Sequence, residues 1–142
     1  MSWSIESVHE AALTPSQIFR FYTDPSTWGS WGHNTRWARS IGPVVEGAIV
    51  EVKAGYGTVY AVRVVRVEPD RLVVCEVRPV GMLVTNTYEV APTPAGVRIR
   101  HAIEVDGKVA GLTRLLQFPR LYRRLLDKEI HRLVALAGRE VR

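Results

Sequence analysis

The sequence predicts an α+β domain in which a curved antiparallel sheet wraps around one long C-terminal helix, with two short helices after the first strand. Three observations predict this fold. Val-rich segments separated by short turns fill residues 38–105, which is typical of an antiparallel meander. Residues 109–141 show one long amphipathic pattern, and residues 13–31 carry helix-start and helix-stop signals. A chain of 142 residues, 46% of them hydrophobic, fits a single domain over residues 1–142.

The first third of the chain holds the short helices. Residues 3–12 alternate loosely between apolar and polar side chains, which favours a strand. Thr14 is a good helix N-cap, and Pro15 suits the first helical position because the N–H that it lacks would have no partner there. We expect this helix to end before Pro25, since a residue that precedes proline is pushed out of the helical region. A second short helix is expected over residues 26–31.

The middle of the chain predicts the sheet. Residues 32–37 are expected to form a polar loop that carries a tryptophan. The strands expected after it lie near Val44-Val45 and at residues 48–52, 57–67, 72–77, 82–91 and 97–105. Clusters of Pro, Gly and Asp mark the turns between these strands.

The last segment predicts one amphipathic helix, which Pro119 should kink or divide. At 100° per residue its apolar stripe comprises Leu115, Phe118, Tyr122, Leu126, Ile130, Leu133 and Ala137. Glu129 falls within this stripe, at about −20° from Tyr122. Its carboxylate either reaches solvent or a strand arginine at the sheet edge, or faces a cavity, where it could bind a ligand or orient His101. We expect Glu129→Leu to stabilise the protein, because leucine belongs on that stripe and a desolvation cost disappears.

Two strands carry polar residues on their apolar faces. His101 alternates with Ile99 and Ile103, so we expect it to point inward, and Asn86 and Tyr88 should lie beside it on the neighbouring strand. A slip of one residue in the register would turn the next residues inward instead, Thr85 and Thr87. His101 is either a core histidine bonded to a tyrosine or backbone group, or a cavity acid/base, because histidine exchanges protons near neutral pH.

Composition excludes several classes of function. The four histidines lack partners at metal-ligand spacing, and glycine-rich nucleotide loops and a serine elbow motif are absent, so we expect no metal and no cofactor. The net charge is +5, but only Arg120, Arg123 and Arg124 cluster, so nucleic acid is not an expected partner. Apolar runs are too short for a membrane span, no secretion signal is visible, and the single Cys75 suits a reducing cytoplasm.

Several motifs together resemble the SRPBCC superfamily, the START/Bet v 1-like helix-grip proteins, and within it the polyketide cyclase/dehydrase-like group. These motifs are the Ala12–Pro15 helix start, the Phe21–Pro25 helix end, the spaced pair Trp28 and Trp31, the Val67–Leu72 hairpin, the Gly96–Ile99 strand start and the closing amphipathic helix. The resemblance covers the whole chain. It implies a helix-grip fold that binds apolar molecules between sheet and long helix; some members cyclise or dehydrate polyketides, and others carry lipids or quinones.

These observations give a set of candidate site residues. The expected partner is a small hydrophobic molecule, aromatic or polyketide-like, and a homodimer is left open. The expected ligand-binding residues are Tyr22, Trp31, Asn86, Tyr88, His101, Tyr122, Leu126 and Glu129. In a cyclase/dehydratase, His101 would be the acid/base, and Tyr88 or Asn86 would orient an enol or carbonyl oxygen. The alternative is a non-catalytic carrier or sensor of a lipid, a quinone or another apolar molecule. His33 and Arg36 are expected mainly to be solvated, although they could gate the entrance.

Overall fold

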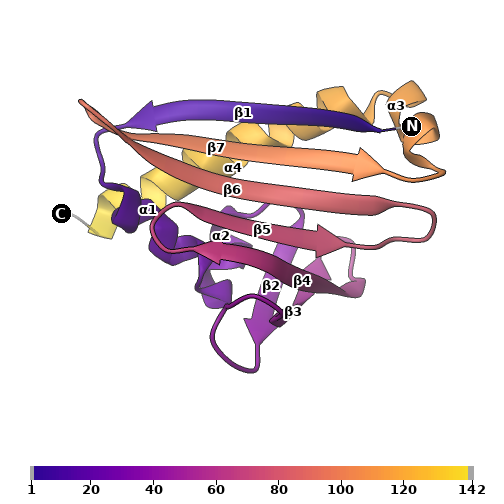
Figure 1. The fold of residues 1–142 in the computed structure, drawn as a ribbon, viewed down its shortest axis with the longest axis horizontal. Helices are drawn as coiled ribbons and strands as arrows, with labels where there is room; N and C mark the ends of the chain where they lie inside the picture. Colours follow the sequence, from indigo (N-terminus) through magenta and orange to yellow (C-terminus); the bar gives the residue numbers. More distant parts are fainter. Residues whose placement is uncertain (1, 141–142) are drawn as a thin grey trace.

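The computed structural model describes residues 2–140 and contains one curved sheet of seven antiparallel strands, with the long helix α4 lying behind it in the view of Figure 1. The strands are β1 (Trp3–Ala11), β2 (Thr35–Ser40), β3 (Ile49–Ala54), β4 (Val59–Glu68), β5 (Leu72–Val77), β6 (Leu83–Thr93) and β7 (Gly96–Asp106). Their order in the sheet is β1-β7-β6-β5-β4-β3-β2. The first strand therefore pairs with the last, and β2 forms the opposite edge.

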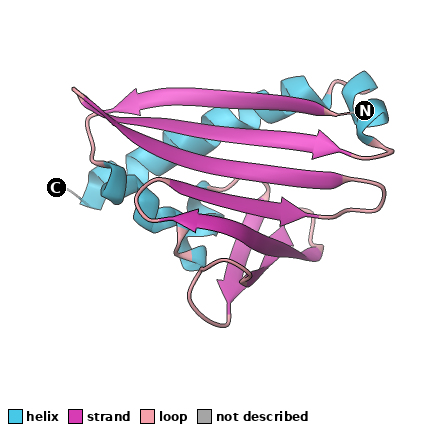
Figure 2. Ribbon diagram, in the orientation of Figure 1, coloured by secondary structure: helices cyan, strands magenta, loops and turns pink. Residues whose placement is uncertain are grey.

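The helices, cyan in Figure 2, lie between β1 and β2 and after β7. They are α1 (Pro15–Tyr22), the 3-10 turn η1 (Pro25–Thr27), α2 (Trp28–Trp31), α3 (Ala110–Leu115) and α4 (Phe118–Glu140). Thr14 caps α1 as expected: its hydroxyl accepts from the Gln17 backbone N–H at 3.3 Å, and the Gln17 side chain accepts from the Thr14 N–H at 2.8 Å. This reciprocal capping box fixes where the chain turns from β1 into the helix.

The register of β6 and β7 is the one that the alternation predicts. Tyr88 lies opposite His101, and Asn86 lies opposite Ile103. Ile99, His101 and Ile103 are buried on one face of β7, whereas Arg98 and Glu104 on the other face are exposed. His101, Asn86 and Tyr88 therefore point to the inner face, and the alternative register through Thr85 and Thr87 is wrong.

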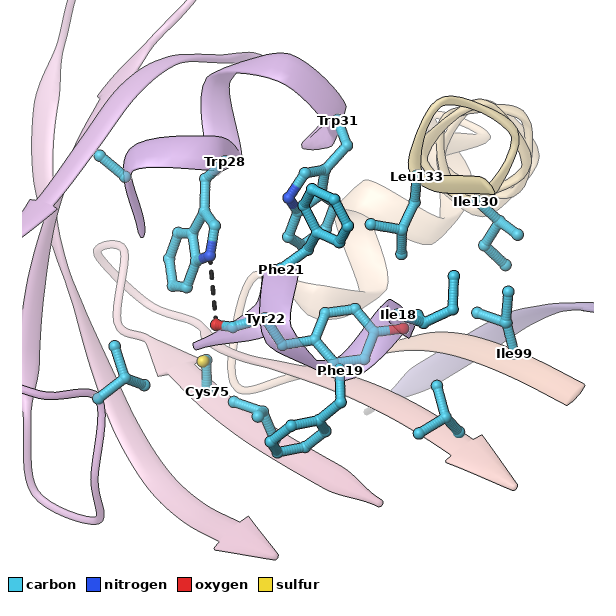
Figure 3. Packing of buried hydrophobic residues seen from close by; sticks show 14 of the residues in the cluster. Ile18, Phe19, Phe21, Tyr22, Trp28, Trp31, Cys75, Ile99, Ile130 and Leu133 are labelled. Carbon is cyan, nitrogen blue, oxygen red and sulfur yellow. Dashed lines mark hydrogen bonds between the residues drawn. The ribbon is translucent and has the colours of Figure 1, made fainter. Parts of the chain in front are cut away.

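The core lies between the inner face of the sheet and α4. Leu126, Ile130, Leu133 and Ala137 are buried along one stripe of α4, as the helical projection predicts. Figure 3 shows Ile130 and Leu133 projecting from α4 toward the aromatic side chains of α1 and α2. Burial of such a stripe is what keeps a helix of this length on the sheet.

The fold class predicted from the sequence is confirmed, and two local expectations at the edge of the sheet are wrong. Residues 35–37, expected in a loop, begin β2 (Thr35–Ser40); the pairing register shifts between Thr35 and Trp37, which interrupts the alternation of the strand. No strand forms within residues 41–48, because turns at Gly42 and at Gly47, whose φ is +88°, interrupt pairing. Val44 is nevertheless buried, as a loop residue.

The long helix is divided, and the break precedes Pro119. Gln117 adopts a left-handed φ of 63°, which ends α3 and starts α4 in a new direction. Pro119 then lies in the first turn of α4, where its missing N–H costs no helical bond. One consequence is that Leu115, expected in the buried stripe, is 77% exposed at the end of α3. Residue 141, the expected end of the helix, lies outside the described residues.

Candidate functional site

A cavity of about 1000 Å³ lies between the inner face of the sheet and the first turns of α4. Its apolar wall includes Val84 and Ile103 from the sheet and Leu121 and Leu125 from α4. Its polar wall includes His33, Tyr60, Asn86 and Tyr122. The expectation that Tyr122 and Asn86 face such a space agrees with this lining.

The exposed charged residues of the cavity lining, Arg63 and Arg78, lie where two strands separate. The pairing of β4 with β5 begins at Arg63 and Glu76, so residues 59–62 of β4 pair with β3 but not with β5. Both residues of that first pair line the cavity, together with Arg78 from the segment after β5. The mouth therefore carries charged side chains, whereas the interior is mostly apolar and aromatic.

A smaller chamber of about 60 Å³ adjoins the main cavity. Four residues line both spaces: His33, Tyr60, Val77 and Asn86. The chamber is also lined by Trp31, Tyr88 and Glu129, three of the residues predicted from the sequence. The inner end of the site is thus a polar and aromatic pocket behind a larger apolar one.

Four side chains, two of which line this pocket, form one continuous hydrogen-bonded series. The Tyr22 hydroxyl lies 2.8 Å from Nε2 of His101, and Nδ1 of His101 lies 3.0 Å from Oε1 of Glu129. The other carboxylate oxygen, Oε2, accepts from the His33 backbone N–H at 3.0 Å and lies 2.5 Å from Nδ1 of His33. This series joins elements that are distant in sequence: α1, β7, α4 and the segment before β2.

The chemistry of these groups determines where the protons lie. An ionised carboxylate can only accept, so Nδ1 of each histidine donates to Glu129. The remaining nitrogen of a neutral His101 is then an acceptor, and Tyr22 donates its hydroxyl proton to it. Nε2 of His33 is the one ring nitrogen in the series that has no partner among residues 2–140.

The histidines keep Glu129 ionised although its side chain is only 2% exposed. Burial alone would raise the pKa of this carboxyl, but the His33 charge and the hydrogen bonds from both histidines outweigh it and hold the pKa well below its usual range. For His33, burial alone would lower the pKa, and the Glu129 carboxylate outweighs it, so the pKa lies above the usual 6.5. Glu129 thus reaches neither solvent nor a strand arginine, the two structural explanations that its place in the stripe suggested.

Aromatic rings enclose the buried histidine. The Tyr88 ring meets the His101 ring edge-on, with 4.9 Å between centroids, and Trp31 meets Tyr88 at 5.6 Å. Burial, with a further contribution from the Glu129 charge, raises the pKa values of Tyr22 and Tyr88 well above 10.0, so both phenols stay neutral hydrogen-bonding groups. Figure 3 shows Tyr22 and Trp31 side by side between α1 and α2, with the Trp28 indole N–H bonded to the Tyr22 carbonyl at 3.3 Å.

The predicted site residues fall into two groups. Asn86, Tyr122, Trp31, Tyr88 and Glu129 line the cavity or its inner chamber. The other three, Tyr22, His101 and Leu126, are almost fully buried and lie behind that lining. Both ring nitrogens of His101 are already bonded within the protein, so its contact with the cavity is indirect, through Glu129 and Tyr88.

The sequence reasoning missed the importance of His33. It was expected to be mainly solvated, but its side chain is only 18% exposed and it lines both chambers. Arg36 does remain exposed. A signal was available: Glu129 inside an apolar stripe required a buried cationic or donor partner. Among residues 2–140, no group of three or more His, Cys, Asp or Glu side chains is arranged to hold a metal ion.

Residues 2–138 match the family described as polyketide cyclase / dehydrase and lipid transport. The chain belongs to this family. The superfamily resemblance carried by the tryptophan pair and the closing helix is therefore confirmed. No curated protein matches the chain. Within residues 2–140, no helix of this cyclase/dehydrase family member is long and apolar enough to cross a membrane.

Solved structures of similar fold include proteins of several kinds. The structure of protein MLL2253 from Mesorhizobium loti is 19% identical, with a TM-score of 0.76, and the match covers 96% of this chain and 98% of that one. A norcoclaurine synthase point mutant from Thalictrum, in complex with a transition-state analogue, is 16% identical, with a TM-score of 0.76 and coverage of 100% and 98%. The di-domain aromatase/cyclase StfQ of the steffimycin biosynthetic pathway is 15% identical, with a TM-score of 0.75 over 99% of this chain and 52% of that one. At these identities the similarity establishes the fold, not the reaction.

Proposed function

We propose that this protein binds a small hydrophobic molecule, aromatic or polyketide-like, in the cavity between the sheet and α4. The observation that carries the proposal is a cavity of about 1000 Å³ with an apolar middle and a polar inner end. Ligand sites typically combine an apolar wall with a few placed polar groups, which fix the orientation of the ligand. Membership of a family of cyclases, dehydrases and lipid carriers supports the same conclusion.

The residues proposed to contact the ligand divide by chemistry. Val84, Ile103 and Leu125 would cover its apolar body, since they line the main cavity. Asn86 and Tyr60 would hydrogen-bond its polar substituents, since they line both chambers. Trp31 and Tyr88 would stack against a ring that reaches the inner chamber.

A titration with Nile red, a neutral dye that fluoresces in apolar surroundings, tests the binding. Wild type should bind the dye saturably while it shows an intact thermal transition. Val84→Trp, which narrows the cavity, should weaken binding about tenfold, equivalent to about 1.4 kcal/mol. Thr85→Trp is the matched control, because its side chain lies on the other face of the same strand and does not line the cavity. Equal binding by wild type and Val84→Trp would place the dye elsewhere and refute the proposal.

Cyclisation with loss of water is the reaction that the polar inner end favours. His33, Tyr60 and Asn86 converge there, and catalysis requires at least two polar groups that act on one reacting atom. A linear triketone that closes to a methylresorcinol with loss of one water is a suitable test substrate. We expect closure faster than in buffer and slower with Asn86→Ala, with Thr85→Ala as the control. Saturable binding of the triketone with no acceleration would instead support a lipid or quinone carrier.

A further inference from the structure

Nε2 of His33 is a hydrogen-bonding atom at the cavity wall, on a ring whose other nitrogen is already held within the protein. Its ring partner Nδ1 and its backbone N–H are both held by Glu129, whereas Nε2 has no hydrogen-bond partner among residues 2–140. Residues 2–140 contain buried polar atoms that have no partner and no access to solvent, and Nε2 of His33 is not among them. Because His33 is buried against Glu129 on one side and lines both chambers on the other, Nε2 is open to the cavity.

Resting on the proposed function, we propose that His33 is the acid/base group of this site and that its ligand presents a ring oxygen, an enol or a phenol, to Nε2. Glu129 is a positioning residue, because it fixes the ring and directs the proton of Nδ1 away from the cavity. His101 and Tyr22 position Glu129 in turn through their own hydrogen bonds. The acid/base role predicted for His101 therefore passes to His33, and His101 acts through the carboxylate.

The proton transfer balances with these groups alone. In the protonated ring, the Nε2–H bond breaks and its proton adds to the enolate or phenolate oxygen, which leaves a neutral imidazole. In the reverse direction the lone pair of Nε2 takes the proton of the enol or phenol, and the negative charge stays on the ring oxygen. A histidinium at this position therefore favours the ionised form of the ligand.

The other titratable groups that face His33 do not compete with this role. Burial raises the pKa of Tyr60 in β4 and of Cys75 in β5 to about 12. Burial also raises the pKa values of Tyr88 in β6 and Tyr122 in α4, whose ring lies 5.7 Å from the His33 ring. These groups stay neutral at neutral pH, so the Glu129 carboxylate is the charge that acts on His33. The charged side chains Arg63, Glu76 and Arg78 lie at the mouth of the cavity.

Umbelliferone, a fluorescent phenol, and herniarin, its methyl ether, form a matched pair of probes. Wild type should bind both, and the pKa of bound umbelliferone, measured from its excitation spectrum, should fall by about one unit. His33→Gln should abolish that fall while herniarin affinity stays within about twofold. The control is His131→Gln, since His131 is exposed on α4, where it packs on His9 away from the cavity.

The possible failures are distinguishable. If neither probe binds to wild type, the proposed function fails and this inference fails with it. If herniarin binds and Val84→Trp weakens its binding, but the shift of umbelliferone persists in His33→Gln, only the role of His33 is refuted.

A measurement on wild-type protein does not depend on how His33→Gln folds. In protein labelled with ¹⁵N at histidine, umbelliferone should move the Nε2 signal of His33 and leave that of His131 unchanged; a shift confined to another histidine would contradict the assignment. Glu129→Gln should lower the pH at which His33 titrates, which a merely structural role would not require. An unchanged titration would remove Glu129 as a positioning residue.

Discussion

Replacing Glu129 with leucine tests the pairing of the buried carboxylate. From sequence alone the replacement should stabilise the protein, because an unpaired carboxylate in an apolar stripe costs desolvation energy. The structure reverses the expected sign. Glu129 accepts three hydrogen bonds, two from His33 and one from His101. Leucine removes the acceptor from all three donors at once.

The magnitude follows from the exposure of those donors. A buried donor without a partner costs about 1–3 kcal/mol, and the His101 ring, at 0% exposure, has no access to water. The His33 groups lie beside the cavity and can bond water, so they contribute less. Leucine recovers up to about 2 kcal/mol of apolar burial. Since removing one partner of a buried pair typically costs 3–5 kcal/mol, we expect a net loss of about 3 kcal/mol.

Thermal and urea unfolding measure this loss. For a domain of this size we expect Glu129→Leu to melt about 6–12 °C below wild type. Glu129→Gln should lose about 1–2 kcal/mol, because an amide oxygen still accepts but without charge. Lys128→Leu, on the exposed face of the same helix turn, is the control and should stay within about 0.5 kcal/mol of wild type. If Glu129→Leu melts at or above wild type, the carboxylate is not stabilised by the histidines and the reasoning is wrong.

Four further predictions concern the same core. Tyr22→Phe leaves Nε2 of His101 without its donor and should cost about 1–3 kcal/mol in urea unfolding; an unchanged midpoint would show that this bond contributes nothing. Cys75, 2% exposed and with a pKa raised to about 12 by burial, should react with a thiol reagent only after unfolding, and rapid labelling of folded protein would contradict its burial. Folding lowers the pKa of Glu129, so its stabilising contribution is present above pH 4.5, the usual pKa of a glutamate, and is lost as the pH falls below that value. The unfolding free energy of wild type should therefore decline more steeply below pH 4.5 than that of Glu129→Gln. His33 has a raised pKa, so its contribution is present below 6.5 and is lost as pH rises through the folded value; His33→Gln should flatten that alkaline decline, and parallel curves would refute it.

The parts of the fold that the sequence predicts are those with a strong period. The alternation of β7 correctly placed His101 on the inner face, and the projection of the last helix correctly placed Glu129 in the buried stripe. Both patterns depend only on which face of one element is apolar. Local turn chemistry likewise identified the cap at Thr14.

The remaining features depend on contacts that no single element encodes. His33 meets Glu129 across 96 residues of sequence; the place of Glu129 in the apolar stripe indicates that it has a buried donor partner, but not which distant residue supplies it. Pro119 correctly predicted that the last helix is divided, but the break lies at Gln117, in a left-handed conformation that glutamine rarely adopts, so the exposure of Leu115 was not predicted. The rings of Tyr88 and Trp31 pack between His101 and the cavity, so His101 points inward without lining it. This packing depends on contacts between several elements and cannot be predicted from the alternation of one strand.

The central claim is that an apolar ring enters the cavity and meets His33 at its inner end. A crystal structure of the protein with umbelliferone bound tests it most directly. We predict that the coumarin rings lie between Val84 and Leu125, with the hydroxyl within hydrogen-bond distance of Nε2 of His33. A probe found in the cavity with its hydroxyl turned to Arg63 or Arg78 at the mouth, or a probe found outside the cavity, would contradict the account.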